Sequence, residues 1–377
     1  MKIAIVAGET SGDLLGAGLL AALKRVYPDL QAEGIAGPQM QAQGCQSLFD
    51  IERLSVMGFV EPLSRLPELI KIRKSLIKRF TENPPDVFIG IDAPAFNIGL
   101  EYHLKKAGIK TVQFVSPSVW AWRKKRIFKI KKAVDLMLTL FPFENKIYDQ
   151  HRVRNCFVGH PFADAIPLES DTFKARELLG LHSDRQYIAI LPGSRHSELK
   201  RLTEPFIEAA RRCYEINPTI AFITPMVNEH KQQQFQEALK LLAPELPFTV
   251  FAGKSQTIMA AADVVLLASG TAALEAMLLG KPMVVAYKLH PLTYCLAKRL
   301  VKLDVVSLPN LLLHKKVIPE LIQEQANPQA LADAVMYYLD HPSEVLRLQQ
   351  QFTEVHRQLK RNANETAAGA IKKLLQM

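Results

Sequence analysis

Short apolar runs alternate along this chain with segments in which apolar residues recur every three or four positions. In the first half the runs cover Lys2–Ala7, Val87–Ile91, Lys110–Val115 and Leu136–Leu140. Such runs are typical of buried strands, and the segments between them have the periodicity of amphipathic helices. Strands that alternate with helices form parallel sheets with crossover helices. The pattern therefore predicts an α/β fold.

The same pattern begins again in the second half. The run Ile3–Ala7, which leads into a Gly/Ser loop, has a counterpart in Ile188–Leu191, which leads into Pro192–Ser197. Between the halves, the passage from His160 to Pro167 resembles a linker. The repeat predicts two Rossmann-like domains that face each other across a cleft.

These observations also give domain limits. We expect an N-terminal domain over residues 1–165 and a C-terminal domain over residues 166–341. Residues 342–377 have a polar helical pattern without strand signals. We expect them to form helices that pack across the domain boundary or exchange between subunits.

The composition agrees with a globular protein of more than one domain. The 377 residues are 48% hydrophobic and 22% charged, and no stretch of about 18 residues is continuously apolar. The short apolar start is followed by Glu9 and Asp13, which argues against a signal peptide. The four cysteines are scattered singly, without zinc or redox spacing. We therefore expect a cytoplasmic protein with reduced thiols.

The positive charge is concentrated in the N-terminal half. Residues 1–160 hold 23 Lys/Arg and 15 Asp/Glu, which is +8 of the total net charge of +10. Such asymmetry indicates an anionic partner, which could be nucleic acid, a phospholipid surface or a phosphorylated substrate.

The most informative segment runs from Ser269 to Val285. A buried strand leads into Ser269-Gly270-Thr271, and an Ala/Leu-rich helix follows. Such a turn leaves backbone N–H groups and a hydroxyl free to hold a phosphate. Glu275 lies four residues after Thr271, on the same side of the helix. This spacing would place a ribose beside the Glu275 carboxylate, and it predicts a site for a nucleotide sugar.

A second loop of the C-terminal half points to the same chemistry. Gly193-Ser194-Arg195 follows an apolar run and precedes a helical segment. An arginine at such a helix start can make bidentate contacts to a diphosphate and offset the charge of a leaving group.

Two loops of the N-terminal half are candidates for the acceptor side. The loop Gly8–Asp13 lacks the full dinucleotide spacing and carries two acids, so it is either a tight turn or a wall in which Ser11 touches a sugar. Asp92 ends an apolar run, where ligands meet open α/β sheets. It could be a general base, or it could cap the helix whose start is indicated by Pro94.

Both tryptophans lie in one basic segment. Trp120 and Trp122 precede Arg123, and residues 123–132 hold seven Lys/Arg and no acid. Aromatic rings stack on sugars and suit membrane interfaces, while the cations suit phosphate. A solvated basic helix start or an RNA surface would show the same composition.

Residues 65–80 predict an amphipathic helix. Its apolar stripe includes Leu66, Leu69, Ile70 and Leu76, with Arg73 near the middle. The stripe suits core packing and membrane contact equally, because a buried Arg73 needs a partner whereas a membrane-bound one could reach the headgroups. Apolar Met57 and Phe59 precede this segment.

No metal site is indicated. The histidines lack partners at ligand spacing, and the chain contains no Asp-x-Asp motif, which a metal-dependent nucleotide-sugar enzyme would be expected to show. Arg195 and the helix start after Ser269 could hold a diphosphate without metal.

Together these motifs resemble the lipid-A-disaccharide synthase family, glycosyltransferases of the GT-B architecture, over nearly the whole chain. The resemblance rests on an ordered set: Gly8-Glu9-Thr10-Ser11-Gly12-Asp13, Asp92-Ala93-Pro94-Ala95-Phe96-Asn97, Ser118-Val119-Trp120-Ala121-Trp122, Gly159-His160-Pro161, Leu191-Pro192-Gly193-Ser194-Arg195, Ser269-Gly270-Thr271 with Glu275, and Ser307-Leu308-Pro309-Asn310.

The resemblance implies a metal-independent, inverting hexosyltransferase that needs no cofactor. It would join UDP-2,3-diacylglucosamine to 2,3-diacylglucosamine 1-phosphate, giving UDP and a β(1→6) tetraacyl disaccharide 1-phosphate for lipid A. It would work at the anionic inner face of the inner membrane, without nucleic acid, as a monomer or a homodimer. A UDP-N-acetylglucosamine 2-epimerase, a polyprenyl-sugar transferase and a basic membrane- or RNA-binding protein are the competing interpretations.

The resemblance also implies residue roles. Asp92 would be the base for the acceptor 6-hydroxyl, and Glu275 would bind the ribose. The other residues group by substrate: Gly193, Ser194, Arg195, Ser269, Gly270, Thr271 and Asn310 for the UDP-sugar; Ser11, Trp120, Trp122 and Arg123 for the acceptor; Met57, Phe59, Leu66, Leu69, Ile70 and Leu76 for acyl chains or membrane.

Overall fold

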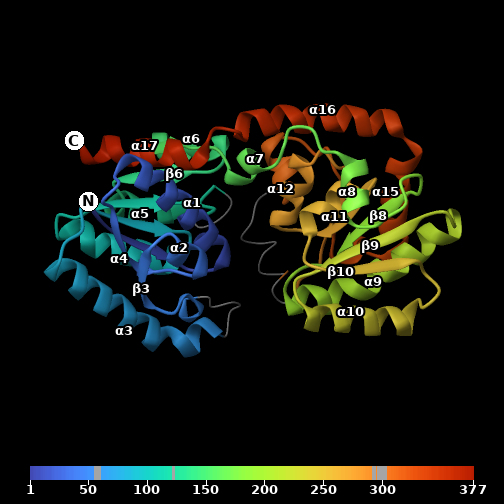
Figure 1. Ribbon diagram of the computed structural model, residues 1–377, viewed down its shortest axis with the longest axis horizontal. Helices are drawn as coiled ribbons and strands as arrows, with labels where there is room; N and C mark the ends of the chain where they lie inside the picture. Colours follow the sequence, from blue (N-terminus) through green and yellow to red (C-terminus); the bar gives the residue numbers. More distant parts are fainter. Residues whose placement is uncertain (55–60, 121–123, 291–293, 295–303) are drawn as a thin grey trace. The chain divides into compact units, whose positions relative to one another are not determined.

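The computed structural model of the protein describes residues 1–54, 61–120, 124–290, 294 and 304–377. The chain forms two compact units, shown in Figure 1. Unit 1 contains Met1–Asp164 and Leu359–Met377, and unit 2 contains Ala165–Gln358. The chain thus passes from unit 1 to unit 2 and returns near its end.

Unit 1 is built on a seven-stranded parallel sheet with the order β3-β2-β1-β4-β5-β6-β7. Its strands are β1 Lys2–Ala7, β2 Gln31–Ile35, β3 Cys45–Phe49, β4 Val87–Ile91, β5 Lys110–Phe114, β6 Leu136–Thr139 and β7 Asn155–Phe157. Its helices are α1 Thr10–Val26, α2 Pro38–Ala42, α3 Glu61–Glu82, α4 Pro94–Lys106, α5 Ile127–Ala133, α6 Pro142–Gln150, α7 Pro161–Ala165 and α17 Ala363–Leu375. The last residue of α7 belongs to unit 2. Short 3-10 turns lie at Ile51–Arg53 and Lys124–Arg126.

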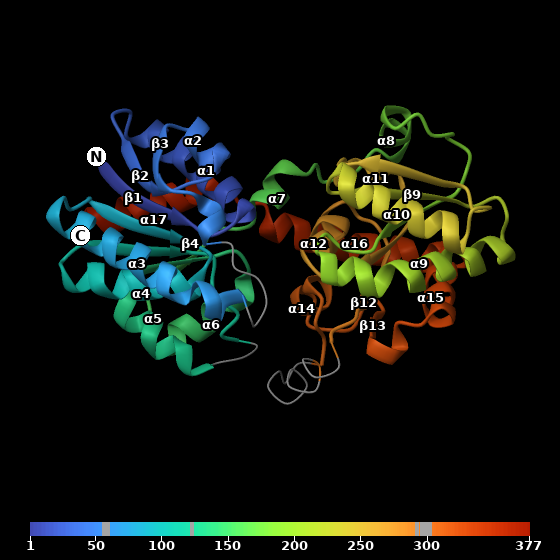
Figure 2. The same cartoon turned by 90° about the horizontal axis from the view of Figure 1, so that it is seen from below.

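Side chains of β1 alternate between two cores, as expected for a strand covered on both faces. Ile3 and Ile5 join a cluster with α1 and α17, whereas Ala4 and Val6 join a cluster with α3 and α4. In Figure 2, α17 lies along the same sheet although it comes from the end of the chain. The apolar face of α17 is therefore part of the core of unit 1.

Unit 2 contains a six-stranded parallel sheet with the order β10-β9-β8-β11-β12-β13. Its strands are β8 Tyr187–Leu191, β9 Ala221–Met226, β10 Phe248–Ala252, β11 Val264–Ala268, β12 Met283–Tyr287 and β13 Glu320–Ile322. Its helices are α8 Thr172–Leu178, α9 His196–Ile216, α10 Glu229–Leu242, α11 Ser255–Ala261, α12 Thr271–Leu278, α14 Leu308–Leu312, α15 Pro328–Asp340 and α16 Pro342–Leu359, with a 3-10 turn at Gln323–Gln325.

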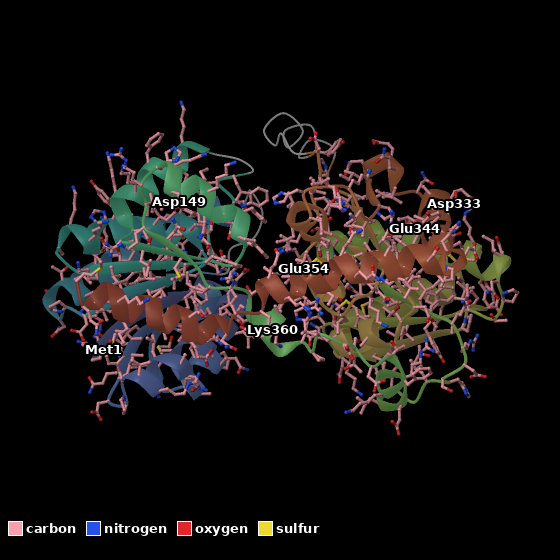
Figure 3. All side chains as sticks on the ribbon, turned by 90° about the horizontal axis from the view of Figure 1, so that it is seen from above. Met1, Asp149, Asp333, Glu344, Glu354 and Lys360 are labelled. Carbon is pink, nitrogen blue, oxygen red and sulfur yellow. The ribbon has the colours of Figure 1, made fainter. Side chains whose placement is uncertain are left out.

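The C-terminal helices divide between the units. Nearly all of α16 belongs to unit 2, and α17 belongs to unit 1; Figure 3 marks α16 by Glu344 and Glu354 and the following turn by Lys360. The start of α17 is fixed within unit 1, because the Asp164 carboxylate accepts hydrogen bonds from the N–H groups of Asn362, at 2.9 Å, and Ala363, at 2.6 Å. None of the described helices is both long and apolar enough to cross a membrane.

Both sheets reverse their strand order next to the first strand. In unit 1 the order runs outward from β1 and from β4 in opposite directions, and in unit 2 it does so from β8 and β11. Loops at the carboxyl ends of two such strands diverge and leave a crevice, which is where open α/β sheets bind ligands. The two reversal points therefore locate the candidate sites.

Candidate functional site

A cavity of about 300 Å³ lies at the reversal point of unit 2. Its walls come from the loops after β8, β9, β10 and β11. The cavity brings together seven of the eight residues predicted to bind a nucleotide sugar: Gly193, Ser194, Arg195, Ser269, Gly270, Thr271 and Glu275.

The loop from β11 to α12 presents polar groups to this cavity. Gly270 is the N-cap of α12. The N–H groups of Thr271 and Ala272 lie in the first turn, where the helix offers them no carbonyl acceptor. Glu275 follows one turn later, and burial raises the pKa of its carboxyl, which accepts a 2.8 Å hydrogen bond from Gln256. The site thus combines anion-binding N–H groups with a hydrogen-bond acceptor.

The loop from β8 to α9 is held by a carboxylate that the sequence interpretation did not consider. Glu198 accepts hydrogen bonds from the N–H groups of Ser194, at 3.1 Å, and Arg195, at 3.2 Å, and it pairs with the Arg195 guanidinium at 3.2 Å. The positive φ of Gly193, +117°, permits the tight turn, and Lys231 donates to the Ser194 carbonyl. An anion that uses these N–H groups must displace Glu198.

Asn310 is not among the residues that line the cavity, and its predicted contact with the nucleotide or donor sugar stays a prediction. Its side chain is fully buried in α14. Its amide group donates to Glu320 at 2.8 Å and to the Ile318 carbonyl at 3.0 Å, and its oxygen accepts from the N–H groups of Val317 and Ile318. These bonds use its polar atoms to fix the approach to β13.

Several residues that line the cavity were missed. Met226 ends β9 and Val227 follows it, and Gly253 and Ser255 follow β10. The signal that could have found them is topological, because loops after neighbouring parallel strands converge at one edge of the sheet. Gly253 also has a positive φ of +67°, as its place between a strand and a helix suggests.

Asp92 lies at the reversal point of unit 1, after β4. Asp92 and Ala93 have positive φ angles of 50° and 40°, which residues with a side chain adopt at a cost. The Asp92 carbonyl accepts hydrogen bonds from the amides of Asn97 and Gln113, both at 3.0 Å. Ala93, not Asp92, is the N-cap of α4, and no side chain caps this helix. The capping interpretation of Asp92 is therefore wrong, and its role as a base stays a prediction.

The Asp92 carboxyl lies beside Glu9. Burial, and next the charge and hydrogen bond of Glu9, raise the pKa of Asp92 to about 6. Ser11 donates to Glu9 at 3.0 Å, so the predicted residues Ser11 and Asp92 are connected through Glu9. A carboxylate with a pKa near neutrality, at a strand end, can accept a proton from a bound hydroxyl.

The other acid of the first loop has a structural role. Asp13 is almost completely buried and accepts hydrogen bonds from the N–H groups of Gly37, Gln39 and Met40 at 2.9 to 3.0 Å. Its carboxylate therefore holds the start of α2. Of the two acids in this loop, only Glu9 belongs to the candidate site.

Trp120 lies against α6 in unit 1. Its ring packs edge-to-face on Phe143, with ring centroids 5.0 Å apart. The buried Glu144 accepts a hydrogen bond from the Trp120 side chain, and burial raises the pKa of Glu144 to about 7. Trp120 is thus anchored by an aromatic and a polar contact in the same domain as Asp92.

The predicted acyl-contact residues of α3 divide into two groups. Leu66 and Ile70 are 48% and 41% exposed. Leu76 is fully buried in the core and Leu69 packs partly against it, so the prediction that Leu76 meets acyl chains or membrane is wrong. Leu76 faces the sheet, as a crossover helix requires.

Four predicted residues lie outside the part of the chain that the structure describes: Met57, Phe59, Trp122 and Arg123. Within the described ranges, no group of three or more His, Cys, Asp or Glu side chains is placed to hold a metal ion.

The sequence matches one family model along nearly its whole length. A model described as lipid-A-disaccharide synthetase covers residues 3–371. A relative named lipid-A-disaccharide synthase, from Vibrio campbellii, is 51% identical over 376 residues, covering 100% of this chain and 99% of the relative. Another, from Saccharophagus degradans, is 53% identical, covering 99% and 97%.

Solved structures resemble this one in fold. A UDP-GlcNAc 2-epimerase from Neisseria meningitidis, bound to UDP-GlcNAc, has a TM-score of 0.64 at 12% identity and covers 100% of both chains. A glycosyltransferase from Rickettsia africae has a TM-score of 0.59 at 10% identity, covering 100% of this chain and 98% of the other. These likenesses concern the fold alone, and they confirm the predicted pair of Rossmann-like domains of the GT-B class.

Replacing Glu9 by Gln removes a negative charge beside Asp92. Ionisation of Asp92 then becomes easier, so we expect its pKa to fall below about 6 but to stay above the ordinary value of 3.8, because burial remains. A carboxyl-carbon NMR titration measures this pKa. The exposed Glu82→Gln is the matched control and should leave Asp92 unchanged; an equal pKa in Glu9→Gln and the wild type would contradict the proximity of the two carboxyls.

Replacing Glu198 by Gln keeps the shape of the loop but removes the charge that competes with an anion. We expect inorganic pyrophosphate to bind about three- to tenfold more tightly, as estimated for one like charge at a partly exposed site. Isothermal titration calorimetry measures the affinity, and thermal unfolding checks the fold. Weaker pyrophosphate binding by a folded Glu198→Gln variant would contradict the competition.

Proposed function

The chain belongs to the lipid-A-disaccharide synthase family, glycosyltransferases of lipid A biosynthesis, and on that premise we propose that it joins UDP-2,3-diacylglucosamine to 2,3-diacylglucosamine 1-phosphate. The products are UDP and a β(1→6)-linked tetraacyl disaccharide 1-phosphate. The observation that carries the proposal is the cavity of unit 2, which gathers N–H groups, a guanidinium and a carboxylate from separate loops.

The donor binds through its nucleotide. The first turn of α12 receives a phosphate, since its N–H groups point out of the helix start. Arg195 exchanges its contact with Glu198 for the diphosphate and offsets the charge that grows on departing UDP. Glu275 accepts hydrogen bonds from the ribose. A solved relative in fold is bound to UDP-GlcNAc, which supports a nucleotide sugar as the ligand.

The transfer proceeds by one in-line displacement, because an α-linked donor gives a β-linked product. The acceptor 6-oxygen attacks the anomeric carbon, the bond to the diphosphate oxygen breaks, and the electron pair leaves with UDP. The proton of the hydroxyl passes to Asp92. The positive charge of the oxocarbenium-like transition state develops as the diphosphate departs.

Two features of unit 1 hold the Asp92 carboxyl for this step. Asn97 and Gln113 fix the backbone of Asp92 through its carbonyl oxygen. Burial, and next the charge and hydrogen bond of Glu9, keep the pKa of Asp92 near neutrality, where a base is both ionised and able to take a proton. Ser11 and Trp120 are the acceptor contacts among the described residues, and Trp122 and Arg123 are proposed from the sequence.

The acylated substrates bring the protein to an anionic membrane surface. Leu66 and Ile70, exposed on α3, are the described residues proposed to meet acyl chains or lipid; Met57 and Phe59 are proposed with them from the sequence. The surplus of Lys and Arg in residues 1–160 favours such a surface.

Removing the base should stop the chemistry without emptying the donor site. We expect Asp92→Asn to lower kcat by about a hundred- to ten-thousandfold, the usual contribution of a general base. UDP affinity should stay within twofold of the wild type, because Asp92 and the donor site belong to different units. Acceptor-dependent UDP release and calorimetry provide the two measurements; wild-type turnover by Asp92→Asn would remove Asp92 from the role of base.

Removing the guanidinium should weaken the nucleotide site. Loss of a hydrogen bond to a charged group costs about 1.5–3 kcal/mol, so we expect Arg195→Ala to bind UDP roughly ten- to a hundredfold more weakly. The exposed Arg212→Ala, within the helix α9 that follows Arg195, removes the same charge and should leave UDP affinity unchanged. If both variants bind UDP alike, Arg195 does not contact the diphosphate.

A further inference from the structure

A second cavity, in unit 1, lies between α3, α4 and α5 and begins at Pro94 and Ala95, the first residues of α4. Its volume is about 500 Å³. The polar side chains that line it are Arg73, Tyr102, His103, Arg126, Lys129 and Lys132, and no Asp or Glu is among its lining residues. The cavity is therefore a basic pocket, and none of the roles assigned above to the donor, the acceptor or the base uses it.

Arg73 extends from α3 into this pocket with its charge incompletely satisfied. Its guanidinium donates to the Ala95 carbonyl at 3.0 Å and lies 5.0 Å from the centre of the Phe96 ring. Its Nε is buried without a hydrogen-bond partner, and burial lowers the pKa of the guanidinium. A partly buried cation without a counter-ion is stabilised by a bound anion.

The lysines of α5 add charge that is not neutralised within the protein. Lys129 and Lys132 are exposed and lie three positions apart, so they are on one side of this short helix. Among the residues that the structure describes, no carboxylate forms a salt bridge with Arg73, Lys129 or Lys132. The pocket thus offers several cations to one ligand.

Exposed apolar side chains flank the same pocket. Leu66 and Ile70 precede Arg73 by seven and three residues, so the three lie along one face of α3. Leu66 and Ile70 are 48% and 41% exposed. Phe128, next to Lys129 in the sequence, lines a different cavity and packs on His151. An anion in the pocket that also carries acyl chains would find apolar surface beside it, which distinguishes this place from a site for a free ion.

We propose that this basic pocket binds the phosphate group of an anionic membrane lipid, whose acyl chains lie against Leu66 and Ile70. The inference rests on the proposed work at a membrane surface and adds a defined headgroup site to it. Arg73 supplies the inner contact and Lys129 and Lys132 the outer ones. Such a site would hold α3 and α5 at the lipid surface.

The test compares two double variants that each lose two exposed lysines from unit 1. Lys129→Ala/Lys132→Ala alters the pocket; Lys110→Ala/Lys131→Ala, which line a different cavity, is the matched control. We expect the pocket variant to bind phosphatidylethanolamine vesicles containing phosphatidylglycerol about tenfold more weakly than the wild type, and the control less than threefold, at the same salt concentration. Thermal unfolding checks that both variants fold.

Turnover in detergent micelles separates this inference from the proposed function. Acceptor-dependent UDP release by the wild type tests the transferase activity independently of the vesicle-binding measurement. Equal loss of vesicle binding in both variants, no loss in either, or no binding by the wild type would overturn the pocket. So would normal vesicle binding by the pocket variant with a raised KM for the acceptor, which would assign the pocket to the phosphate of the substrate.

Discussion

The parallel strand order, which reverses at the first strand of each sheet, is the constraint on which the sites of this protein depend. In unit 1, α1 covers one face of the sheet and α4 covers the other, so the loops after β1 and β4 diverge. Glu9 and Ser11 lie in or just after the first of these loops, and Asp92 lies in the second. Unit 2 repeats the arrangement with β8 and β11, which place Arg195 and Thr271 at one cavity.

The two reversal points carry opposite chemistry. In unit 2, helix-start N–H groups and Arg195 favour an anion, and the Glu198 carboxylate occupies part of that position. In unit 1, the neighbouring carboxyls of Glu9 and Asp92 disfavour an anion, and burial together with Glu9 raises the pKa of Asp92. The division suits a glycosyl transfer, in which one substrate must lose a diphosphate and the other must lose a proton.

The sequence predicts most of this arrangement because its signals are local. Apolar runs mark the strands, and Gly, Ser and Thr after a run mark loops at the carboxyl ends of strands. Seven of the residues predicted to bind the donor therefore line one cavity. Local signals do not reveal contacts between a side chain and residues that are distant in the sequence. Nothing near Asn310 shows that Glu320 and the backbone at Val317 and Ile318 will use its amide.

Leu76 and Glu198 show two further limits. A helical stripe has the same spacing whether it faces a sheet or a membrane, and only the fold shows that Leu76 is in the core while Leu66 and Ile70 remain exposed. Glu198 follows Arg195 by three residues, a spacing typical of helix starts, yet its contact with the same N–H groups that suit a phosphate depends on the tight turn at Gly193.

The measurement that tests the central claim most directly is UDP release by the purified protein from UDP-2,3-diacylglucosamine, with and without 2,3-diacylglucosamine 1-phosphate, in the presence of EDTA. The account predicts release that requires the acceptor and persists in the chelator. Release that is independent of the acceptor, or no release by a protein that still binds UDP, would contradict it.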